Sequence, residues 1–464
     1  MAATGAVAVA AAAAAVVADE RGSNASGAPA GGVPDAPITD AGSMTTSSTG
    51  ISRTALDRGL RVVTEPMPSL RSVAVGLWIG TGGIDEPDRI LGASHFLEHL
   101  GFKGTARRTA HEIASAVESV GGDMNAFTAH ELTCFYVRMP DEYLELALDI
   151  LADVVWAPAL RAEDVDQERG VIVEELRMRD DQPDDVVHEQ FMEAVFPRHP
   201  LGRPVLGTEA TIDAMGREDI AGYHAAHYLP SNTVLSVAGN ASHQRVLELI
   251  GDRMPAGDAR RPARAGAPLS PVRPLVVVNR PSEQAHVVLG HRSFRRDDPD
   301  RYALAVLNQA LGGGMASRLF QEVREQRGLA YSVYSFRSAY EDTGTVAVYV
   351  GTGPEKVHET IDVVQGVLDS VVADGLADDE VAAAKGHLKG ATALSLESSS
   401  SRMHRNGRSE LVEGEIPTLD ELQARVEAVT PDDVRRVAGR MFEGPQVLSV
   451  VGPFDEADFS DRVA

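Results

Sequence analysis

Three polar residues near position 100 carry the strongest signal for chemistry. The segment LGASHFLEHLGFKGT (residues 91–105) contains His95, Glu98 and His99 among mostly apolar neighbours. If residues 89–101 form a helix of about 100° per residue, these three side chains share one face and the apolar side chains share another. Histidines four residues apart can bind one metal ion, and Glu98 can reach a water on that ion. The alternative is a chance match on a polar helix face.

A hydrolytic zinc site needs a third protein ligand and an open position for water. The segment DQERGVIVEELRMRDD contains Glu168 and Glu175, which lie seven residues apart and therefore on one face of a predicted helix. Val171 and Ile172 share that face, which indicates partial burial, and a buried carboxylate is unfavourable unless it is paired or metal-bound. This helix is the best source of the missing ligand. Glu174 lies about 100° away from Glu168 and is less favoured, and a solvated acidic helix is the alternative.

An internal repeat separates the chemistry from the fold. Each half of the chain runs from strand to strand to an acidic turn with Asp-Arg, and then to an amphipathic helix that ends in Leu-Gly, at residues 100–101 and 311–312. This spacing predicts duplication of a whole domain. Under this alignment His95 faces Val306, Glu98 faces Gln309 and His99 faces Ala310; in the segment LADDEVAAAKGHLKGATA of the second half, Ala384 and Ala391 stand where Glu168 and Glu175 would fall. The polar residues are therefore not needed to build the fold.

The pattern of helices and β-branched strands predicts an α+β fold with two homologous domains, each a mostly antiparallel sheet packed with helices. We expect residues 1–50, rich in Ala, Gly and Ser, to be a disordered extension. The metal-binding domain follows at residues 51–255. Residues 256–273, rich in Pro, Ala, Gly and Arg, are predicted to be a linker, and residues 274–464 are the homologous domain without the metal-binding residues.

Composition excludes several classes of function. The net charge of −25 over 464 residues argues against a nucleic-acid partner, because no basic surplus exists to neutralise phosphates. No segment is apolar and long enough to predict a membrane span. A single cysteine, Cys134, permits no intrachain disulfide and fits a reducing compartment. We expect a cytoplasmic protein, and export through the alanine-rich N-terminus stays open as an alternative.

The sequence resembles the pitrilysin-type (inverzincin) zinc metallopeptidases, specifically the short bacterial members related to mitochondrial processing peptidase. The resemblance covers nearly all of residues 51–455. His95, Glu98 and His99 match the family's inverted zinc motif, Glu175 matches its distal ligand, and Glu168 matches its auxiliary acidic residue.

Two further segments carry the resemblance. GGDMNAFTAHELTCFYVRMP is similar to the family's strand beside the scissile peptide, where Asn125 and Ala126 would contact substrate. LGGGMASRLFQEVREQRGLAYSVYS is similar to its Gly-rich loop and Arg-Tyr pair, matched here by Arg324 and Tyr331.

The resemblance implies a zinc endopeptidase with one zinc ion per chain, which cleaves extended peptides inside an enclosed chamber. Glu98 would be the general base, and Glu168 would orient the site. Arg324 and Tyr331 would donate hydrogen bonds to the oxyanion or to the substrate backbone. We expect the substrate to add a strand to the sheet edge near residues 133–137.

The resemblance also implies an assembly. The family encloses peptides between four homologous domains, and this chain supplies two, so a homodimer is expected and a heterodimer stays open. Arg324 and Tyr331 would act on the partner's zinc or on their own. A non-catalytic scaffold, or the inactive subunit of a heterodimeric peptidase, is the alternative function. Glu98 beside a complete ligand set favours the enzyme, because a silent subunit has no need of it.

Overall fold

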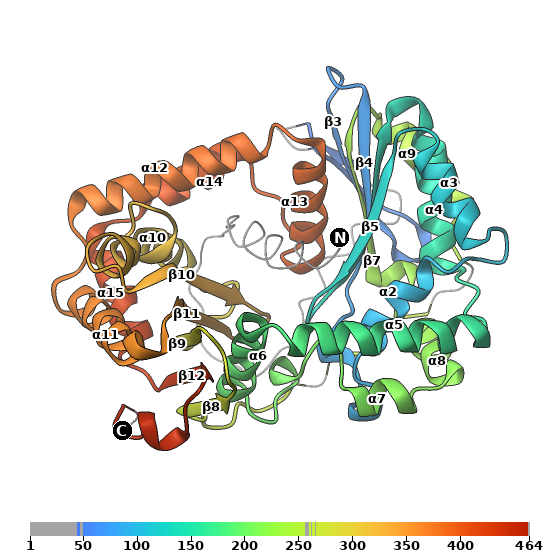
Figure 1. Cartoon of the computed structure of the whole chain (residues 1–464). Helices are drawn as coiled ribbons and strands as arrows, with labels where there is room; N and C mark the ends of the chain where they lie inside the picture. Colours follow the sequence, from blue (N-terminus) through green and yellow to red (C-terminus); the bar gives the residue numbers. More distant parts are fainter. Residues whose placement is uncertain (1–43, 47–49, 256–258, 261, 265, 463–464) are drawn as a thin grey trace.

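The strands that the structure describes form two separate sheets, one in each half (Figure 1). The computed structural model describes residues 44–46, 50–255, 259–260, 262–264 and 266–462. Most of the predicted extension, residues 1–50, therefore lies outside the described residues. One part of that prediction is wrong, because β1 (Met44–Thr46) pairs antiparallel with β2 (Ser52–Ala55). Threonine favours strands, and β1 covers what would otherwise be the open edge at β2.

The first sheet has the strand order β1-β2-β3-β7-β4-β6-β5. Its other strands are β3 (Arg61–Pro66), β4 (Ser72–Ile79), β5 (Asp123–Thr128), β6 (Thr133–Pro140) and β7 (Thr233–Gly239). The β3–β7 pair is parallel and the remaining pairs are antiparallel. Strands β4 and β7 are buried on both faces, which is why their sequences are almost continuously apolar.

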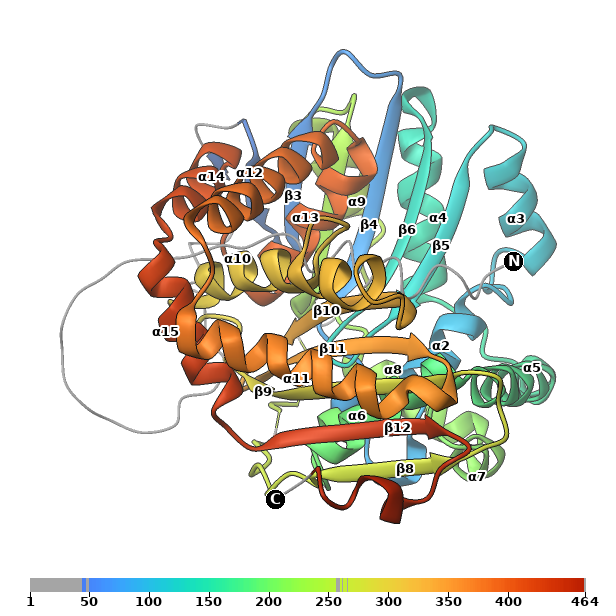
Figure 2. The same cartoon turned by 60° about the vertical axis from the view of Figure 1, so that its left-hand side comes forward.

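The second sheet repeats this arrangement (Figure 2). Its strands are β8 (Leu275–Asn279), β9 (Ala285–Ser293), β10 (Ala330–Ala339), β11 (Gly344–Thr352) and β12 (Gln446–Gly452). The order β8-β12-β9-β11-β10 matches β3-β7-β4-β6-β5, and again only the first pair is parallel. The predicted α+β fold with an internal duplication is therefore confirmed.

Helices cover the outer face of each sheet. Those of the first half are α2 (Ala93–Gly101), α3 (Ala110–Glu118), α4 (Leu144–Trp156), α5 (Ala162–Asp180), α7 (Glu209–Ala214), α8 (Arg217–His227) and α9 (His243–Gly251). Those of the second half are α10 (Arg301–Gly312), α11 (Val357–Asp374), α12 (Asp378–Ser395), α14 (Leu419–Ala428) and α15 (Pro431–Phe442). Helix α2 lies between α5, α8 and the sheet, and α10 takes the matching place in the second half.

Two equivalent helices are exchanged between the halves. Helix α6 (Pro183–Val195) belongs to the first half in sequence, yet it packs on β12, β9 and β8 of the second sheet. Its counterpart α13 (Ser399–Val412) packs on β4, β7 and β3 of the first sheet. The α13 contact is close: a Cβ at Gly407 would lie 2.2 Å from Nε1 of Trp78, so only glycine fits there. Each sheet therefore depends on a helix from the other half.

The segment that joins the halves is fixed to both. Between the end of α9 and the start of β8, its described residues contain no helix or strand. Arg264 in this segment pairs with Asp85 of the first half (Nε to Oδ1, 2.9 Å) and with Glu341 of the second (Nη1 to Oε2, 3.3 Å). These ion pairs hold the connection against both halves.

Membrane-spanning helices are absent from the described part of the chain, since none of its helices combines the necessary length with a sufficiently apolar sequence.

Candidate metal centre

Helix α2 carries the three residues of the inverted motif. It begins at Ala93 rather than at residue 89, because residues 88–90 form a short 3-10 turn and Gly92 takes a left-handed conformation with φ of 92°. As predicted, Phe96, Leu97 and Leu100 are buried in the core of the first half. His95 is also buried, with 7% of its surface exposed. The motif therefore lies where the helix meets α5 and not on an open surface.

The structure brings the predicted third ligand to both histidines. The Oε2 atom of Glu175, on α5, lies 3.4 Å from Nε2 of His99 and 3.6 Å from Nε2 of His95. One donor atom from each of these three residues lies within 4.8 Å of the other two. Zinc bonds of about 2.0–2.2 Å in a tetrahedral shell leave ligand atoms roughly 3.3–3.5 Å apart. The donor types and their spacing therefore fit a zinc ion.

Glu168 orients one of the two histidines. Its Oε2 atom accepts a hydrogen bond from Nδ1 of His99 at 2.9 Å, and its Oε1 atom pairs with Lys103. Burial favours the neutral form of Glu168, but hydrogen bonds from His99 and Lys103 outweigh it and hold the pKa of Glu168 below its usual value. With Nδ1 engaged in this way, Nε2 of His99 is the atom that faces Glu175 and that could bind a metal ion.

The electrostatics of the cluster favour a cation. Burial lowers the pKa of His99, but hydrogen bonds to Glu168 and Glu175 outweigh it and raise that pKa to about 9. Burial, together with the charge on His99, lowers the pKa of His95 to about 4. The carboxylates thus stabilise positive charge placed between them. When both histidines are neutral and Glu98, Glu168 and Glu175 are ionised, the positive charge of Lys103 leaves the cluster with two negative charges. A divalent cation would balance them.

Glu98 has the properties of a proton acceptor. Burial raises the pKa of its carboxyl group, which brings that pKa closer to neutrality. The Thr128 hydroxyl donates a 2.7 Å hydrogen bond to Oε2 of Glu98, which fixes one of its oxygens. Thr128 is the last residue of β5, so the strand beside the helix holds the carboxylate in place.

Strand β5 is the free edge of the first sheet in the described chain, which corrects one prediction. Residues 133–137 belong to β6, which is paired with β4 on one side and with β5 on the other and cannot accept another strand. Asn125 and Ala126 lie on β5 itself. The Asn125 side chain is exposed, and its Oδ1 atom accepts a 2.8 Å hydrogen bond from N of Ala126. An added strand would therefore pair with β5.

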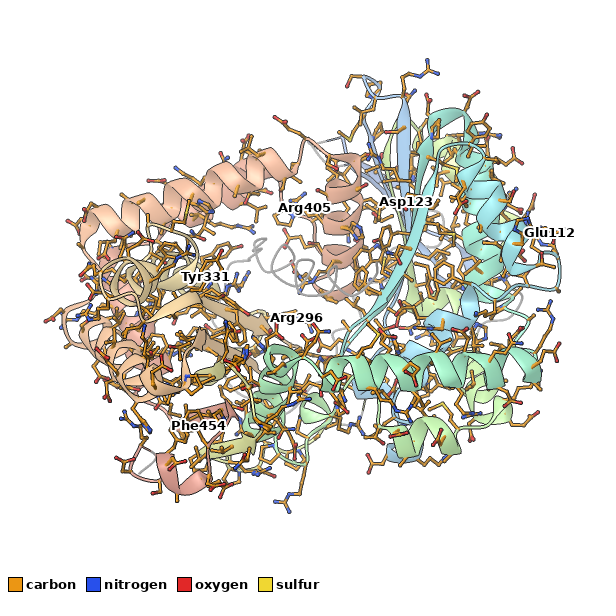
Figure 3. All side chains as sticks on the ribbon, viewed as in Figure 1. Glu112, Asp123, Arg296, Tyr331, Arg405 and Phe454 are labelled. Atoms are coloured by element: carbon orange, nitrogen blue, oxygen red, sulfur yellow. The ribbon has the colours of Figure 1, made fainter. Side chains whose placement is uncertain are left out.

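The structure does not bring Arg324 and Tyr331 to the metal-binding residues. The Arg324 guanidinium lies 4.5 Å from the centre of the Tyr331 ring, so the two residues contact each other. In the described chain, no hydrogen bond, ion pair or ring contact joins either to His95, Glu98, His99 or Glu175. Tyr331 lies in the second half, apart from Asp123 at the start of β5 (Figure 3). Its side chain is 78% exposed and free to contact another molecule.

Two residues of the centre were missed by the sequence analysis. Lys103 lies four residues after His99, and this helical spacing could have suggested that it is near Glu168. Thr128 is 30 residues from Glu98, and no local pattern links the two.

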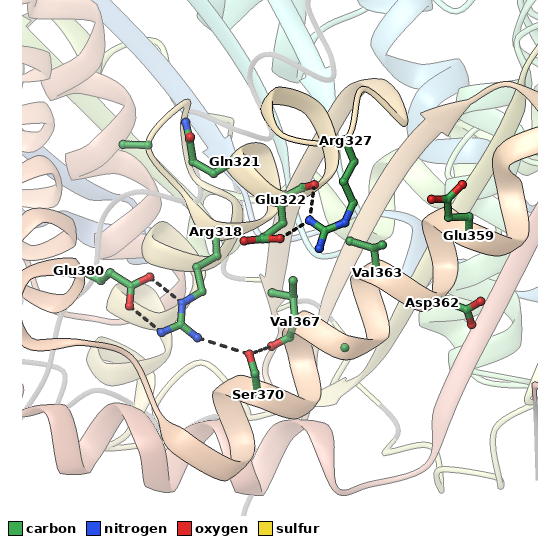
Figure 4. Close-up of a pocket in the computed structure, with 12 residues that line it drawn as sticks. Arg318, Gln321, Glu322, Arg327, Glu359, Asp362, Val363, Val367, Ser370 and Glu380 are labelled. Atoms are coloured by element: carbon green, nitrogen blue, oxygen red, sulfur yellow. Dashed lines mark hydrogen bonds and ion pairs between the residues drawn. The ribbon is translucent and has the colours of Figure 1, made fainter.

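A surface hollow of about 710 Å³ lies elsewhere, between the segment around residue 320 and helices α11 and α12 of the second half (Figure 4). Two ion pairs lie within its charged walls. Arg318 binds both carboxylate oxygens of Glu380 at 2.6 Å, and Arg327 pairs with Glu322. None of its lining residues belongs to the metal centre.

Comparison with known sequences identifies the family. The profile described as "Insulinase (Peptidase family M16)" matches residues 61–209, and the one described as "Peptidase M16 inactive domain" matches residues 214–388. An "uncharacterized zinc protease" of Streptomyces coelicolor is 45% identical over 419 residues, covering 88% of this chain and 91% of the relative. Another of Bacillus subtilis is 39% identical, covering 87% of this chain and 98% of the relative. The chain therefore belongs to peptidase family M16, as its resemblance to the pitrilysin-type enzymes predicted.

Solved structures share the two-sheet fold. A peptidase M16 inactive domain from Pseudomonas fluorescens aligns with a TM-score of 0.81 at 22% identity, covering 87% of this chain and 98% of that one. A protease from Helicobacter pylori aligns with a TM-score of 0.79 at 24% identity, covering 87% of this chain and 99% of that one.

Proposed function

We propose that this protein is a zinc-dependent endopeptidase that cleaves peptides or unfolded segments bound as an extended strand. The observation that carries the proposal is the convergence of His95, His99 and Glu175 on one point, with the Glu98 carboxylate close enough to feel the charges on His99 and Glu175. A zinc ion held there would polarise the scissile carbonyl and acidify a water molecule. The relatives named as zinc proteases support the choice of metal and reaction.

Each residue of the centre has a role in this proposal. Glu98 takes a proton from the attacking water and returns it to the leaving amine, a task suited to a partly buried carboxyl of raised pKa. Glu168 keeps His99 in the tautomer that presents Nε2. The substrate backbone pairs with the open edge of β5, beside Asn125 and Ala126.

We also propose that two copies of the chain form the working enzyme. Among the described residues, no hydrogen bond, ion pair or ring contact joins the exposed Tyr331 or its neighbour Arg324 to the proposed metal ligands of the same chain. In a homodimer these two side chains can approach the partner's metal centre and donate hydrogen bonds to the substrate or the oxyanion. The single cysteine supports the cytoplasm as the compartment.

The function is tested by measuring zinc content and cleavage of a mixed peptide library. One zinc per chain is expected, with cleavage that is lost on chelation and restored by adding zinc. A chain that binds zinc and cleaves none of the library would instead be a scaffold or an inactive subunit.

The shared site is tested by mixing two inactive variants. Glu98→Gln and Tyr331→Phe chains are exchanged into mixed dimers, in which one site combines an intact Glu98 with an intact Tyr331. Activity above that of either variant alone is expected. Mixed dimers no more active than the variants would show that Tyr331 acts within its own chain or not at all.

A further inference from the structure

The N-terminus of the metal-binding helix is held by a side chain from outside the helix. Helix α2 follows Gly92, which offers no side chain to cap it. Glu86 supplies the missing acceptors: its Oε2 accepts from N of Gly92 and its Oε1 from N of Ser94, each at 2.7 Å. These are two of the backbone N–H groups that the first turn of a helix leaves unpaired. Glu86 is 3% exposed, so water does not compete for them.

The hydrogen bond that N of Ser94 donates to Glu86 lies next to His95, which has fewer hydrogen bonds than His99. The His99 ring is oriented by Glu168, whereas the buried Nδ1 atom of His95 has no hydrogen-bond partner among the residues that the structure describes. The position of the His95 ring therefore depends on packing and on the backbone that carries it. That backbone begins at Ser94, whose N–H is bound by Glu86 and whose hydroxyl lies 3.1 Å from the Tyr223 hydroxyl.

The second half shows that this arrangement is not required to build the helix. The turn DEPDR (residues 85–89) corresponds to DDPDR (residues 297–301), so Asp298 stands in the place of Glu86. The shorter Asp298 side chain accepts from N of Asp300, two residues away, at 2.8 Å, and its other oxygen pairs with Arg440 at 3.3 Å, so it binds one backbone N–H group and not two. Helix α10 then begins at once, at Arg301. The longer carboxylate occurs in the half whose helix carries the histidines.

Keeping a carboxylate in this position has an energetic cost. Burial raises the pKa of Glu86 to about 7, although hydrogen bonds from Ser94 and Gly92 and the charge on Arg203 oppose the rise. In most helices Ser, Thr or Asp at the N-cap position accepts these hydrogen bonds. Here the N-cap position must be glycine, because Gly92 is left-handed and a Cβ there would lie 2.6 Å from O of Leu206. The acceptor therefore has to come from another residue.

We propose that Glu86 is a positioning residue of the metal centre, which fixes the first turn of α2 so that His95 meets His99 and Glu175 at one ion. The inference rests on the proposed zinc site. Glu86 touches neither the ion nor the substrate, and it acts through the backbone N–H groups of Gly92 and Ser94. Its loss should therefore weaken zinc binding more than it weakens the fold.

The test compares the zinc affinity of full-length variants by chelator competition, together with their unfolding temperatures. Glu86→Gln replaces one acceptor oxygen by a donor that faces an N–H group, and a zinc affinity roughly 10- to 100-fold weaker is expected. Asp298→Asn is the matched control, which weakens a cap and the ion pair with Arg440 in the other half and should leave the affinity within about twofold of wild type. At saturating zinc, Glu86→Gln should recover most of the cleavage rate.

Several outcomes would overturn the proposal. These are an unchanged zinc affinity in Glu86→Gln, an equal loss in Asp298→Asn, or a wild-type chain that binds no zinc. If Glu86→Gln does not fold, Glu86→Asp decides, since its shorter side chain keeps the charge and reaches one N–H group; an intermediate affinity supports the proposal and a wild-type affinity contradicts it. A wild type that binds zinc without cleaving peptides would overturn the proposed function alone, because the affinities still test Glu86.

Discussion

Helices α2 and α10 occupy the same place in the two halves, and they differ in what they carry. Both lie on the outer side of a five-strand unit with the same order and directions. Helix α2 presents two histidines to α5 and Glu98 to β5, whereas α10 has Val306, Gln309 and Ala310 at the aligned positions. The same helix is thus built with and without the polar groups. This comparison separates the residues that fold the protein from those that we propose to bind a metal.

The largest expected effect tests this separation directly. Glu98→Gln gives α2 the residue that α10 already has, so the unfolding temperature should stay close to wild type. The cleavage rate should fall about a thousandfold, within the range for loss of a general base, while zinc remains bound. Steady-state kinetics, calorimetry and metal analysis measure the three quantities.

Glu174→Gln is the matched control, because Glu174 is on α5 beside Glu175 but its side chain is exposed and pairs with Arg177. A Glu98→Gln enzyme with near wild-type kcat would show that Glu98 is not the general base.

The next prediction concerns whether the two halves unfold together. Leu100 and Leu311 are equivalent and fully buried, at 1% and 0% exposure, and Leu→Ala at either should cost about 3 kcal/mol. Both tryptophans, Trp78 and Trp156, lie in the first half. Since α6 and α13 tie the sheets to each other, Leu311→Ala should shift the tryptophan fluorescence transition as much as the circular dichroism transition in urea. If the midpoint of the tryptophan fluorescence transition were the same in Leu311→Ala as in wild type, the two halves would unfold independently.

A smaller effect is expected from the support of His99. Glu168→Gln should weaken zinc binding by about 10- to 100-fold, because the carboxylate that fixes the imidazole is lost and Lys103 is left without its partner. Lys103→Met should act in the same direction and less strongly. Glu163→Gln, on the exposed side of the same helix, is the control in chelator competition. Equal affinities for all three variants would contradict a role for Glu168.

The smallest effect compares the exchanged helices. His404 of α13 lies 4.7 Å from the Tyr136 ring, and His188 of α6 lies 5.1 Å from the ring of Tyr349, each at the matching place. Burial lowers the pKa of His404 to about 4 and also lowers that of His188.

A histidine with a lowered folded pKa contributes its full stability above the unfolded pKa of about 6.5, and that stability is lost as the pH falls towards 4. His404→Phe should therefore make unfolding less sensitive to acid, by on the order of 1–2 kcal/mol at pH 4.5. Urea unfolding at several pH values measures this, with the exposed His111→Phe as control. Parallel curves for His404→Phe and wild type would mean that folding does not lower the pKa of His404.

Much of the centre could be predicted because its signals are local. The spacing of His95 and His99, and that of Glu168 and Glu175, are properties of single helices, and the repeat identified which side chains are dispensable for folding. The start of α2 was misplaced because the left-handed Gly92 leaves no signature beyond the glycine itself.

Other features depend on contacts between distant residues. The free edge was assigned to the wrong strand, since strand order is set by pairing between segments far apart in sequence. The hydrogen bond from Thr128 to Glu98 and the exchange of α6 and α13 are likewise invisible to periodicity, because the amphipathic pattern of a helix shows that it packs and not on which sheet.

The exchange of α6 and α13 bears on the history of the chain. The equivalent helix of each repeat, α6 or α13, packs on the sheet of the other repeat. The same relation is found between two identical subunits that swap an element about a two-fold axis. A primitive gene coding for one repeat could thus have produced a symmetric pair, which a later fusion joined through the segment around Arg264. After fusion, one set of the proposed metal ligands would be enough, so the second set would no longer be under selection. The exchanged helices would still be needed to fold both repeats. Loss of His and Glu in the second repeat is then the expected outcome of a shared scaffold.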